Sequence, residues 1–482
     1  MHLDPRHRGG GARRILQSGS VIIRFLASKS LSLTLFGVPG LKRIFVSILA
    51  LVAASVTMTC CGYNSSSPST THKPSGLAFR VFISNPLFPT GTGTNLPVLN
   101  IVDALLDVLS LSSVSLTGTS NQPGLMTVSP DLKFTLVYSP SGNSVTVIDN
   151  ASEAVATAAG STTSLQPIPL PGFTESIAVG PFSTTAYAAV PTATVLGQAP
   201  GAVEVLNLQN GSINASIPVP GAHFLVPSPD GNHILVFSDN SDTVTVISTI
   251  LIGTNTDPRS YVTGFDRPVW GIFTNSATAY VLNCGPQCSG KASGVSVLDV
   301  GATTSASTTP VSAATYGLLN GSTLYVAGTT PPNPSGTNTC TGTTTAATTC
   351  GRLSIIDTGS MTVTGTATIS DGYHDRMQIS QNGQLFIGSH SCTNINIAGG
   401  EVRGCLSIFN TNSPGVVIPP NNGDVTGIQQ ITGRDIVYVV QNGGLQIYDA
   451  DTNKLQVTPG NTQNNNGQVN IVGQLFDVKL VD

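Results

Sequence analysis

Beyond its first 61 residues, the densest group of ionisable residues in this 482-residue chain is the stretch YHDRM, which brings together His374, Asp375 and Arg376. Only 9% of the residues are charged, so such a cluster is unusual here. A His, an Asp and an Arg at one site can bind an anionic or sugar-like ligand, or polarise a lactone carbonyl while the His assists attack by water. Glu175 is a further candidate for that chemistry. The simpler alternative is an Asp and Arg pair that satisfies loop backbone groups.

Other side chains are candidates for ligand binding without catalysis. Trp270, the single tryptophan, can floor a sugar site by stacking, although packing in the core is the simpler explanation for so large a ring. Tyr316, His223 and Arg267 are the other candidates. Like Asp266 and Asp424, they stand just ahead of an apolar segment that we expect to form a strand.

Familiar catalytic and metal-binding motifs are absent from the sequence, which contains no GxSxG, P-loop, HExxH or EF-hand pattern. The stretch SDNSD at residues 238–242 superficially suggests calcium, but its residues are typical turn formers. Six cysteines fall in close pairs whose spacing predicts three local disulfides rather than a zinc site. These pairs are Cys284 with Cys288, Cys340 with Cys350, and Cys392 with Cys405. We expect no metal and no cofactor.

The elements that must position these residues come from an internal repeat of about fifty residues. In the clearest copy, PDGNHILVFSDNSDTVTVIS at residues 229–248, a turn precedes an apolar strand, and a polar turn leads to a second one. Eight copies of the first strand are expected at RVFIS, FTLVY, TAYAAV, HILVF, TAYVL, TLYVA, QLFIG and IVYVV. A further apolar segment precedes nearly every pair and another follows it. Four strands per unit predict an all-β chain, folded as a β-propeller of four-stranded blades.

Closure of the ring is predicted from two gaps in the repeat. The first unit opens directly at SGLAFRVFISN and lacks an inner strand, whereas GQLFDVKLVD at residues 473–482 is a spare strand. We therefore expect residues 473–482 to supply the inner strand of the first blade. Eight blades are predicted, with seven as the alternative if one irregular unit is a hairpin insertion.

The copy at residues 229–248 resembles the YVTN-type β-propeller repeat, with its Pro-Asp-Gly turn, apolar strand and Val-x-Val-Ile-Asp strand. The resemblance covers residues 76–482 and is clearest around residues 130, 230 and 380. It implies a fold more than an activity, because such propellers serve as binding proteins, surface proteins and occasionally as lactonase-like or quinoprotein enzymes. A single tryptophan argues against the quinoprotein class.

Long loops are expected on one face of the propeller. In this strand order, the loops between the second and third strands share that face with the connections between blades. All three cysteine pairs lie within or at the ends of such loops, and bridging them would shorten and stiffen the free segments. This arrangement favours a binding surface, with resistance to proteolysis as the alternative. Residues 229–248 have the plainest loops, and we expect that unit to be purely structural.

The N-terminal region is typical of an export signal. Lys42 and Arg43 precede the apolar run at residues 44–58, which is too short to span a bilayer and is followed by two cysteines. These resemble the lipobox of bacterial lipoproteins, with Cys61 as the favoured lipidation site and Cys60 as the alternative. Residues 1–61 are then the leader, of which 1–37 are interpreted as preceding the true start. Residues 62–75 are a flexible Ser/Thr/Pro tether.

The composition and the predicted export signal together lead to a functional hypothesis. A net charge of −4 provides no basic surface for nucleic acid. We expect a monomer in the cell envelope, outside the cytoplasm and held to the membrane only by its lipid. It would bind a protein or a glycan through the loop-rich face without catalysis. The alternative is a lactonase-like hydrolase, favoured if His374 and Arg376 share a pocket with a second carboxylate.

Overall fold

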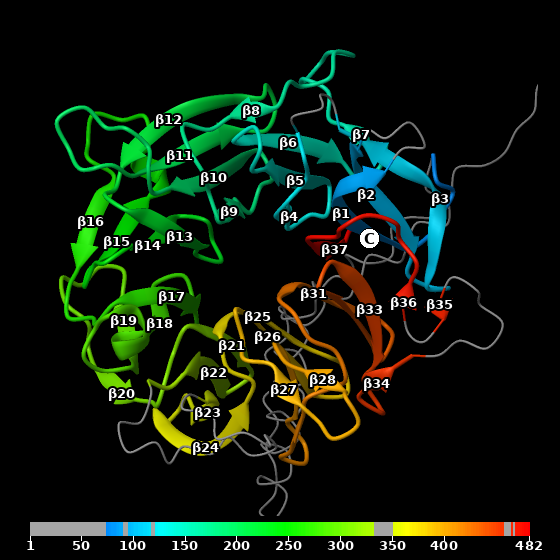
Figure 1. Ribbon diagram of the computed structural model, residues 1–482. Coiled ribbons are helices and arrows are strands. Elements are labelled where there is room, and N and C mark those ends of the chain that lie inside the picture. The colour runs from blue at the N-terminus through cyan, green and yellow to red at the C-terminus, as the bar shows by residue number, and fades with distance from the viewer. Residues whose placement is uncertain (1–73, 90–94, 117–120, 332–349, 457–463, 466–467) are drawn as a thin grey trace, which may run out of the picture. The chain divides into compact units, whose positions relative to one another are not determined.

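The computed structural model describes residues 74–89, 95–116, 121–331, 350–456, 464–465 and 468–482. Residues 66–482 form one compact unit, in which eight antiparallel sheets are arranged in a ring (Figure 1). The predicted fold is therefore confirmed as an eight-bladed β-propeller, and the seven-blade alternative is wrong. The expected leader, the lipidation cysteines and nearly all of the tether lie outside the described residues. Among those described, no helix is both long and apolar enough to span a membrane.

The first four blades follow one another around the ring, and the strands of each are named in order from the inner strand outward. Blade 1 contains β37 (Val478–Leu480), β1 (Arg80–Pro89), β2 (Asn95–Asp103) and β3 (Val108–Ser115). Blade 2 contains β4 (Met126–Val128), β5 (Phe134–Ser139), β6 (Ser144–Asp149), β7 (Ala154–Val155) and β8 (Ile168–Pro169). Blade 3 contains β9 (Ser176–Val179), β10 (Thr185–Val190), β11 (Ala202–Asn207) and β12 (Ser212–Pro218). Blade 4 contains β13 (Ala222–Pro227), β14 (His233–Ser238), β15 (Val244–Ser248) and β16 (Arg259–Val262).

The other four blades complete the ring, together with two short 3-10 helices, η1 (Thr249–Leu251) and η2 (Gly285–Cys288). Blade 5 contains β17 (Pro268–Phe273), β18 (Thr278–Asn283), β19 (Gly294–Asp299) and β20 (Thr308–Pro310). Blade 6 contains β21 (Tyr316–Asn320), β22 (Thr323–Thr329), β23 (Gly351–Asp357) and β24 (Thr362–Ile369). Blade 7 contains β25 (Tyr373–Ile379), β26 (Gln384–His390), β29 (Leu406–Asn410) and β30 (Val416–Val417), with the hairpin β27 (Ile395–Asn396) and β28 (Val402–Arg403) inserted. Blade 8 contains β31 (Val425–Ile431), β32 (Ile436–Gln441), β33 (Gly444–Asp449), β34 (Lys454–Leu455), β36 (Gln468–Val469) and β35 (Asn464–Asn465).

The turn that opens the clearest repeat explains why its sequence is so regular. Ser228 Oγ donates to Asp230 Oδ1 at 2.6 Å, and the backbone N–H of His233 donates to Ser228 Oγ at 3.0 Å. Gly231 between them has φ +72°, a conformation that favours glycine. Side chains thus fix the turn before β14, and equivalent Ser-centred turns precede β5 and β26, the other two clear copies.

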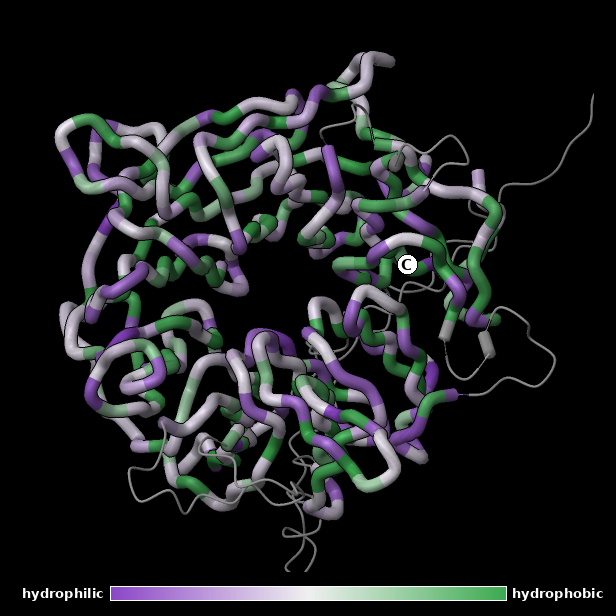
Figure 2. Tube along the Cα trace, in the orientation of Figure 1, coloured by the Kyte–Doolittle hydropathy of each residue, from purple (hydrophilic) through white to green (hydrophobic). Residues whose placement is uncertain are grey.

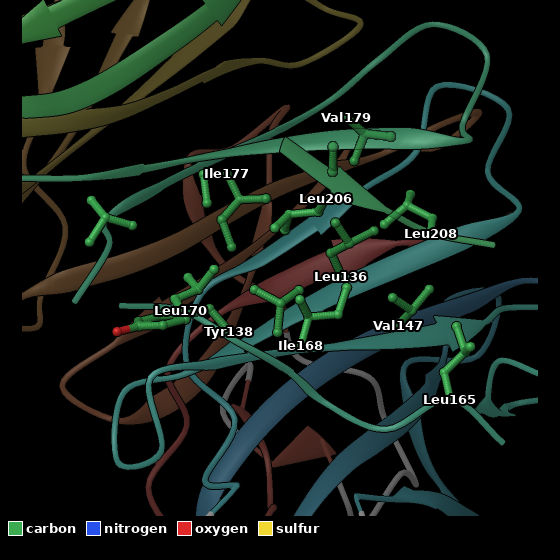
Figure 3. Packing of buried hydrophobic residues seen from close by; sticks show 14 of the residues in the cluster. Leu136, Tyr138, Val147, Leu165, Ile168, Leu170, Ile177, Val179, Leu206 and Leu208 are labelled. Atoms are coloured by element: carbon green, nitrogen blue, oxygen red, sulfur yellow. The ribbon is translucent and has the colours of Figure 1, made fainter. Parts of the chain in front are cut away.

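The hydrophobic core is divided into eight clusters, each lying between two neighbouring blades. Figure 3 shows one of them, where Leu136 and Val147 of blade 2 pack against Ile177, Val179 and Leu206 of blade 3. Hydrophobic residues are accordingly distributed around the whole ring instead of gathering in one sector (Figure 2). Each blade is stabilised by two neighbours, so an open ring would leave two blades with one face uncovered.

The C-terminal strand closes the ring as predicted. β37 pairs antiparallel with β1, placing Val478 opposite Ile83 and Leu480 opposite Val81. Val478 is fully buried and belongs to the cluster shared by blades 8 and 1. The last ten residues therefore complete blade 1 and also pack against its neighbour.

Candidate functional site

Two adjoining cavities lie where the inner strands begin. The outer one, of about 430 Å³, is bordered by loops of blades 4 and 5, and the inner one, of about 230 Å³, is bordered mainly by inner strands. Both are lined by Glu175, Phe224, Val269 and Tyr373. Two contiguous spaces with few but charged polar groups are a suitable setting for a small ligand.

β-Bulges near the start of four inner strands decide which side chains reach these cavities. The register shifts between Ala222 and Phe224 in β13 and between His374 and Arg376 in β25, with similar shifts in β17 and β31. The extra residue in the two named strands is His223 or Asp375, and both side chains line a cavity. A bulge re-aims a side chain and bends the strand, so it serves here to direct polar groups inward.

His374 does not lie at the mouth, contrary to the sequence-based expectation. It precedes the bulge, like Ala222 in blade 4, and both residues are 0% exposed. Its Nε2 contacts the carbonyl oxygen of Ser370 at 2.9 Å, and burial lowers the pKa of His374 to about 4. The residue is therefore a neutral part of the blade interior and does not share the cavity with Arg376.

His223 lies between two carboxylates from neighbouring blades. Its Nε2 is 2.8 Å from Glu175 Oε2, and its Nδ1 is 2.7 Å from Asp239 Oδ1. Burial opposes the charge, but the hydrogen bonds to Asp239 and Glu175 prevail and raise the pKa of His223 to about 9. The hydrogen bond from His223 in turn lowers the pKa of Glu175. At neutral pH the imidazolium donates through both nitrogens and joins blade 3 to blade 4.

A second charged group is centred on Asp375. Its Oδ2 accepts from Arg376 Nη1 at 3.0 Å and lies 3.7 Å from His390 Nδ1. The Arg376 Nε also donates to the carbonyl oxygen of Thr426 at 3.2 Å, which fixes the guanidinium against blade 8. The nearby Asp375 carboxylate raises the pKa of His390. The remaining Asp375 oxygen, Oδ1, is buried and has no hydrogen-bond partner among the residues that the structure describes.

Aromatic rings form a continuous row beside these charges. The rings of His223 and Phe224 are stacked at 4.2 Å, Phe224 meets Trp270 edge-on at 6.1 Å, and Trp270 lies 4.7 Å from Tyr316. Within the described residues, the Trp270 Nε1 and the Tyr316 and Tyr373 hydroxyls form no hydrogen bond with the protein. Because burial raises the pKa of both tyrosines, their hydroxyls remain protonated at neutral pH.

Two disulfides bridge loops on the described part of the chain, and one of these loops borders the outer cavity. The predicted disulfides between Cys284 and Cys288 and between Cys392 and Cys405 are present. Cys288 itself lines the outer cavity. In the third predicted pair, Cys340 lies outside the described residues.

Three further candidates hold the loops of this face in place. Asp266 accepts from the backbone N–H groups that follow the first disulfide, and Asp424 accepts from Ser391 N at 2.7 Å. Arg267 lines the outer cavity but binds loop 239–243, donating through Nη1 to the Asn240 carbonyl at 2.5 Å. All three side chains therefore satisfy loop backbone groups, which is a structural role.

Sequence reasoning missed several residues of the site. Asp239 belongs to the repeat at residues 229–248, which the sequence predicts to be purely structural, yet its carboxylate contacts His223 in the wall of the outer cavity. Its carboxylate was interpreted as a turn former, and only the neighbouring blade reveals its partner. Tyr373, His390 and Lys479 also line the cavities without having been identified as candidates.

No metal centre is found at this site. Within the residues that the structure describes, no group of three or more His, Cys, Asp or Glu side chains is arranged to hold a metal ion.

Comparison with known proteins identifies the fold. No family model and no curated protein matches the chain. The dihydro-heme d1 dehydrogenase NirN in complex with DHE superposes with a TM-score of 0.53 at 12% identity, covering 86% of this chain and 77% of its own. A functionally unknown protein from Desulfotomaculum acetoxidans (TM-score 0.48, 15% identity, 77% and 98% covered) and the Pseudomonas aeruginosa periplasmic gluconolactonase PpgL (0.43, 14%, 84% and 99%) are more distant. At such identities the likeness extends to the fold alone.

Proposed function

We propose that the propeller is a binding module whose two adjoining cavities take a carbohydrate. The observation that carries the proposal is the row of Phe224, Trp270 and Tyr316. It lies beside half-buried carboxylates and beside polar groups that have no hydrogen-bond partner among the described residues. Aromatic faces pack against the apolar face of a sugar ring, while carboxylates and tyrosine hydroxyls accept and donate hydrogen bonds to its hydroxyls. A ligand held in this way needs no catalytic group.

The single tryptophan provides a direct test, because all tryptophan fluorescence of the protein comes from Trp270 in the cavity wall. A panel of neutral, acidic and amino oligosaccharides is titrated into the folded domain. The Trp270 emission is followed in a fluorimeter and the heat of binding in a calorimeter. We expect a saturable change for at least one of them. Tyr373→Ala should then weaken binding at least tenfold. Tyr261→Ala, which removes an exposed ring from the outer strand β16, is the matched control and should bind like the unchanged protein.

A protein ligand is the competing outcome of the same test. If no oligosaccharide binds but a pull-down with the domain captures one protein whose binding is lost in Tyr373→Ala, the carbohydrate assignment is wrong while the cavities remain the binding site. Capture that is insensitive to this substitution would place the function elsewhere on the molecule.

Lactone hydrolysis is a second candidate, supported by the contact of His390 with Asp375 beside Arg376. His223 is unsuited to act as the base at neutral pH, because it is protonated and both of its nitrogens donate to carboxylates. His390 is the remaining histidine that lines the cavities. A colorimetric lactonase assay tests this: any activity should fall at least a hundredfold in His390→Gln and be unaffected in His233→Gln, a variant of a blade residue outside the cavities.

We also propose that the domain is displayed outside the cytoplasm on a lipid anchor, a monomer that touches the membrane only through the lipid. The two disulfides support an oxidising compartment. Metabolic labelling with a radioactive fatty acid in a bacterial host should label the unchanged chain and Cys60→Ala but not Cys61→Ala. Labelling that persists in Cys61→Ala and disappears in Cys60→Ala would reassign the site.

A further inference from the structure

The loop closed by the disulfide between Cys284 and Cys288 reaches away from its own blade. Between the two cysteines, η2 carries Gln287, whose side-chain amide lies over the start of blade 7. Its Oε1 accepts from the backbone N–H of Thr329 at 2.9 Å, and its Nε2 donates to the carbonyl oxygen of Gly372 at 3.3 Å. One side chain from blade 5 is thus bonded to the backbones of blades 6 and 7.

Gly372 immediately precedes Tyr373, so this contact acts on the wall of both cavities. The Gly372 carbonyl also accepts from Thr329 Oγ1 at 2.6 Å, and the three residues form a closed triangle of hydrogen bonds. Gly372 has φ +103°, and a Cβ at that position would lie 2.5 Å from the His390 carbonyl oxygen. The segment therefore runs tightly against residues 389–392 of its own blade, and side chains of blades 5 and 6 also hold it.

The loop itself is held rigidly on the side of blade 5. The disulfide limits η2 to a single turn, and Asp266 accepts from the N–H groups of Lys291 and Ala292 at the end of the loop. Cys288 and Ser289, next to Gln287, line the outer cavity. The part of the loop that borders the ligand space and the part that holds Gly372 are therefore the same few residues.

We infer that Gln287, locked in place by the Cys284 to Cys288 disulfide, is a positioning residue that sets Tyr373 and the bulged start of β25 at the cavity wall. The inference rests on the proposed function for its biological meaning. In physical terms, the bridged loop of blade 5 orders the start of β25 in blade 7 and contributes little to the stability of the propeller. Two amide hydrogen bonds and one short loop are small against eight interblade cores.

Hydrogen exchange followed by mass spectrometry tests this on the intact chain without any ligand. In Gln287→Ala and in the double variant Cys284→Ser/Cys288→Ser, amides at residues 371–376 should exchange at least tenfold faster than in the unchanged protein. The thermal midpoint should move by no more than a few degrees, and the other blades should exchange as before. The matched control is Gln198→Ala, which alters an exposed glutamine in the corresponding loop of blade 3. It should change neither the exchange of residues 371–376 nor the thermal midpoint.

Gln287→Glu separates the two hydrogen bonds of the side chain. A carboxylate still accepts from Thr329 N but cannot donate to the Gly372 carbonyl, so Thr329 should stay protected while residues 371–376 lose protection. Acrylamide quenching of Trp270 fluorescence should increase in each variant that loosens β25, because Trp270 and Tyr373, the first residue of β25, line the same inner cavity. Unchanged exchange at residues 371–376 in Gln287→Ala, or an increase spread over all blades, would overturn the inference. Neither result depends on whether a carbohydrate binds.

Discussion

At the scale of single residues, the most informative side chain is His223, because its charge is set by two blades at once. Its imidazolium bonds Glu175 on one side and Asp239 on the other, at 2.8 and 2.7 Å. A histidine held charged in this way is an ion-pair bridge and a hydrogen-bond donor, in contrast to the buried and neutral His374. Two histidines that both stand near the start of an inner strand thus have opposite protonation states at neutral pH.

The raised pKa of His223 predicts a particular dependence of stability on pH. The charged form is favoured in the folded state, so its contribution is complete below pH 6.5, the ordinary value, and is lost as the pH rises through about 9. Urea unfolding of the unchanged protein and of His223→Gln should therefore differ by about 1–2 kcal/mol at pH 6 and converge at pH 10. A difference that stays constant between these pH values would show that the charge of His223 contributes nothing to folding.

At the scale of elements, the strands were predictable and the orientation of their first residues was not. All eight first strands of the repeat begin at the predicted residues, since short, continuous apolar runs between fixed turns leave little choice of where a strand begins. The bulges in β13 and β25 are not marked by any residue type, yet they decide that His223 and Asp375 face the cavity and His374 does not. Asp239 was missed for a related reason, since its role depends on contact with another blade.

The closing strand supports a prediction about a single element. Deleting residues 473–482 should prevent the domain from folding or lower its thermal midpoint by more than ten degrees, because blade 1 loses its inner strand and blade 8 loses packing. Val478→Ala is the milder variant that keeps the strand, and it should cost about 2 kcal/mol because Val478 is fully buried. The control is Val472→Ala, which truncates a residue that is 58% exposed and should cost less than 0.5 kcal/mol. Equal effects of the two substitutions in urea denaturation would contradict the closure.

At the scale of the whole molecule, stability depends on charge as well as on apolar packing where the ring closes. Arg80, 1% exposed, donates to Asp482 and to Glu153, at 2.7 Å in each case. Its guanidinium thereby connects the closing segment to blade 2. The carboxylates of Asp482 and Glu153 are almost fully buried, so the three charges depend on one another.

Removal of this arginine should therefore be costly. Arg80→Met would remove the cation that two buried carboxylates share, and we expect a loss of about 3–5 kcal/mol in the free energy of unfolding. Arg259→Met, which breaks an ion pair with the exposed Asp257, should cost about 1 kcal/mol or less. Similar losses for the two variants in urea titrations at neutral pH would mean that the buried network is no stronger than a surface pair.

Ring closure by β37 also has a consequence for how the protein is made. The inner partner of β1, β37, is synthesised about four hundred residues after it, so blade 1 stays incomplete, with one strand edge open, until residues 478–480 have been made. Contacts of such long sequence separation fold slowly, and an open strand edge is prone to pair with other chains. The nascent protein therefore has an interval of aggregation risk that lasts until β37 has been synthesised, and a chain truncated before residue 478 would have seven complete blades and no strand to finish blade 1.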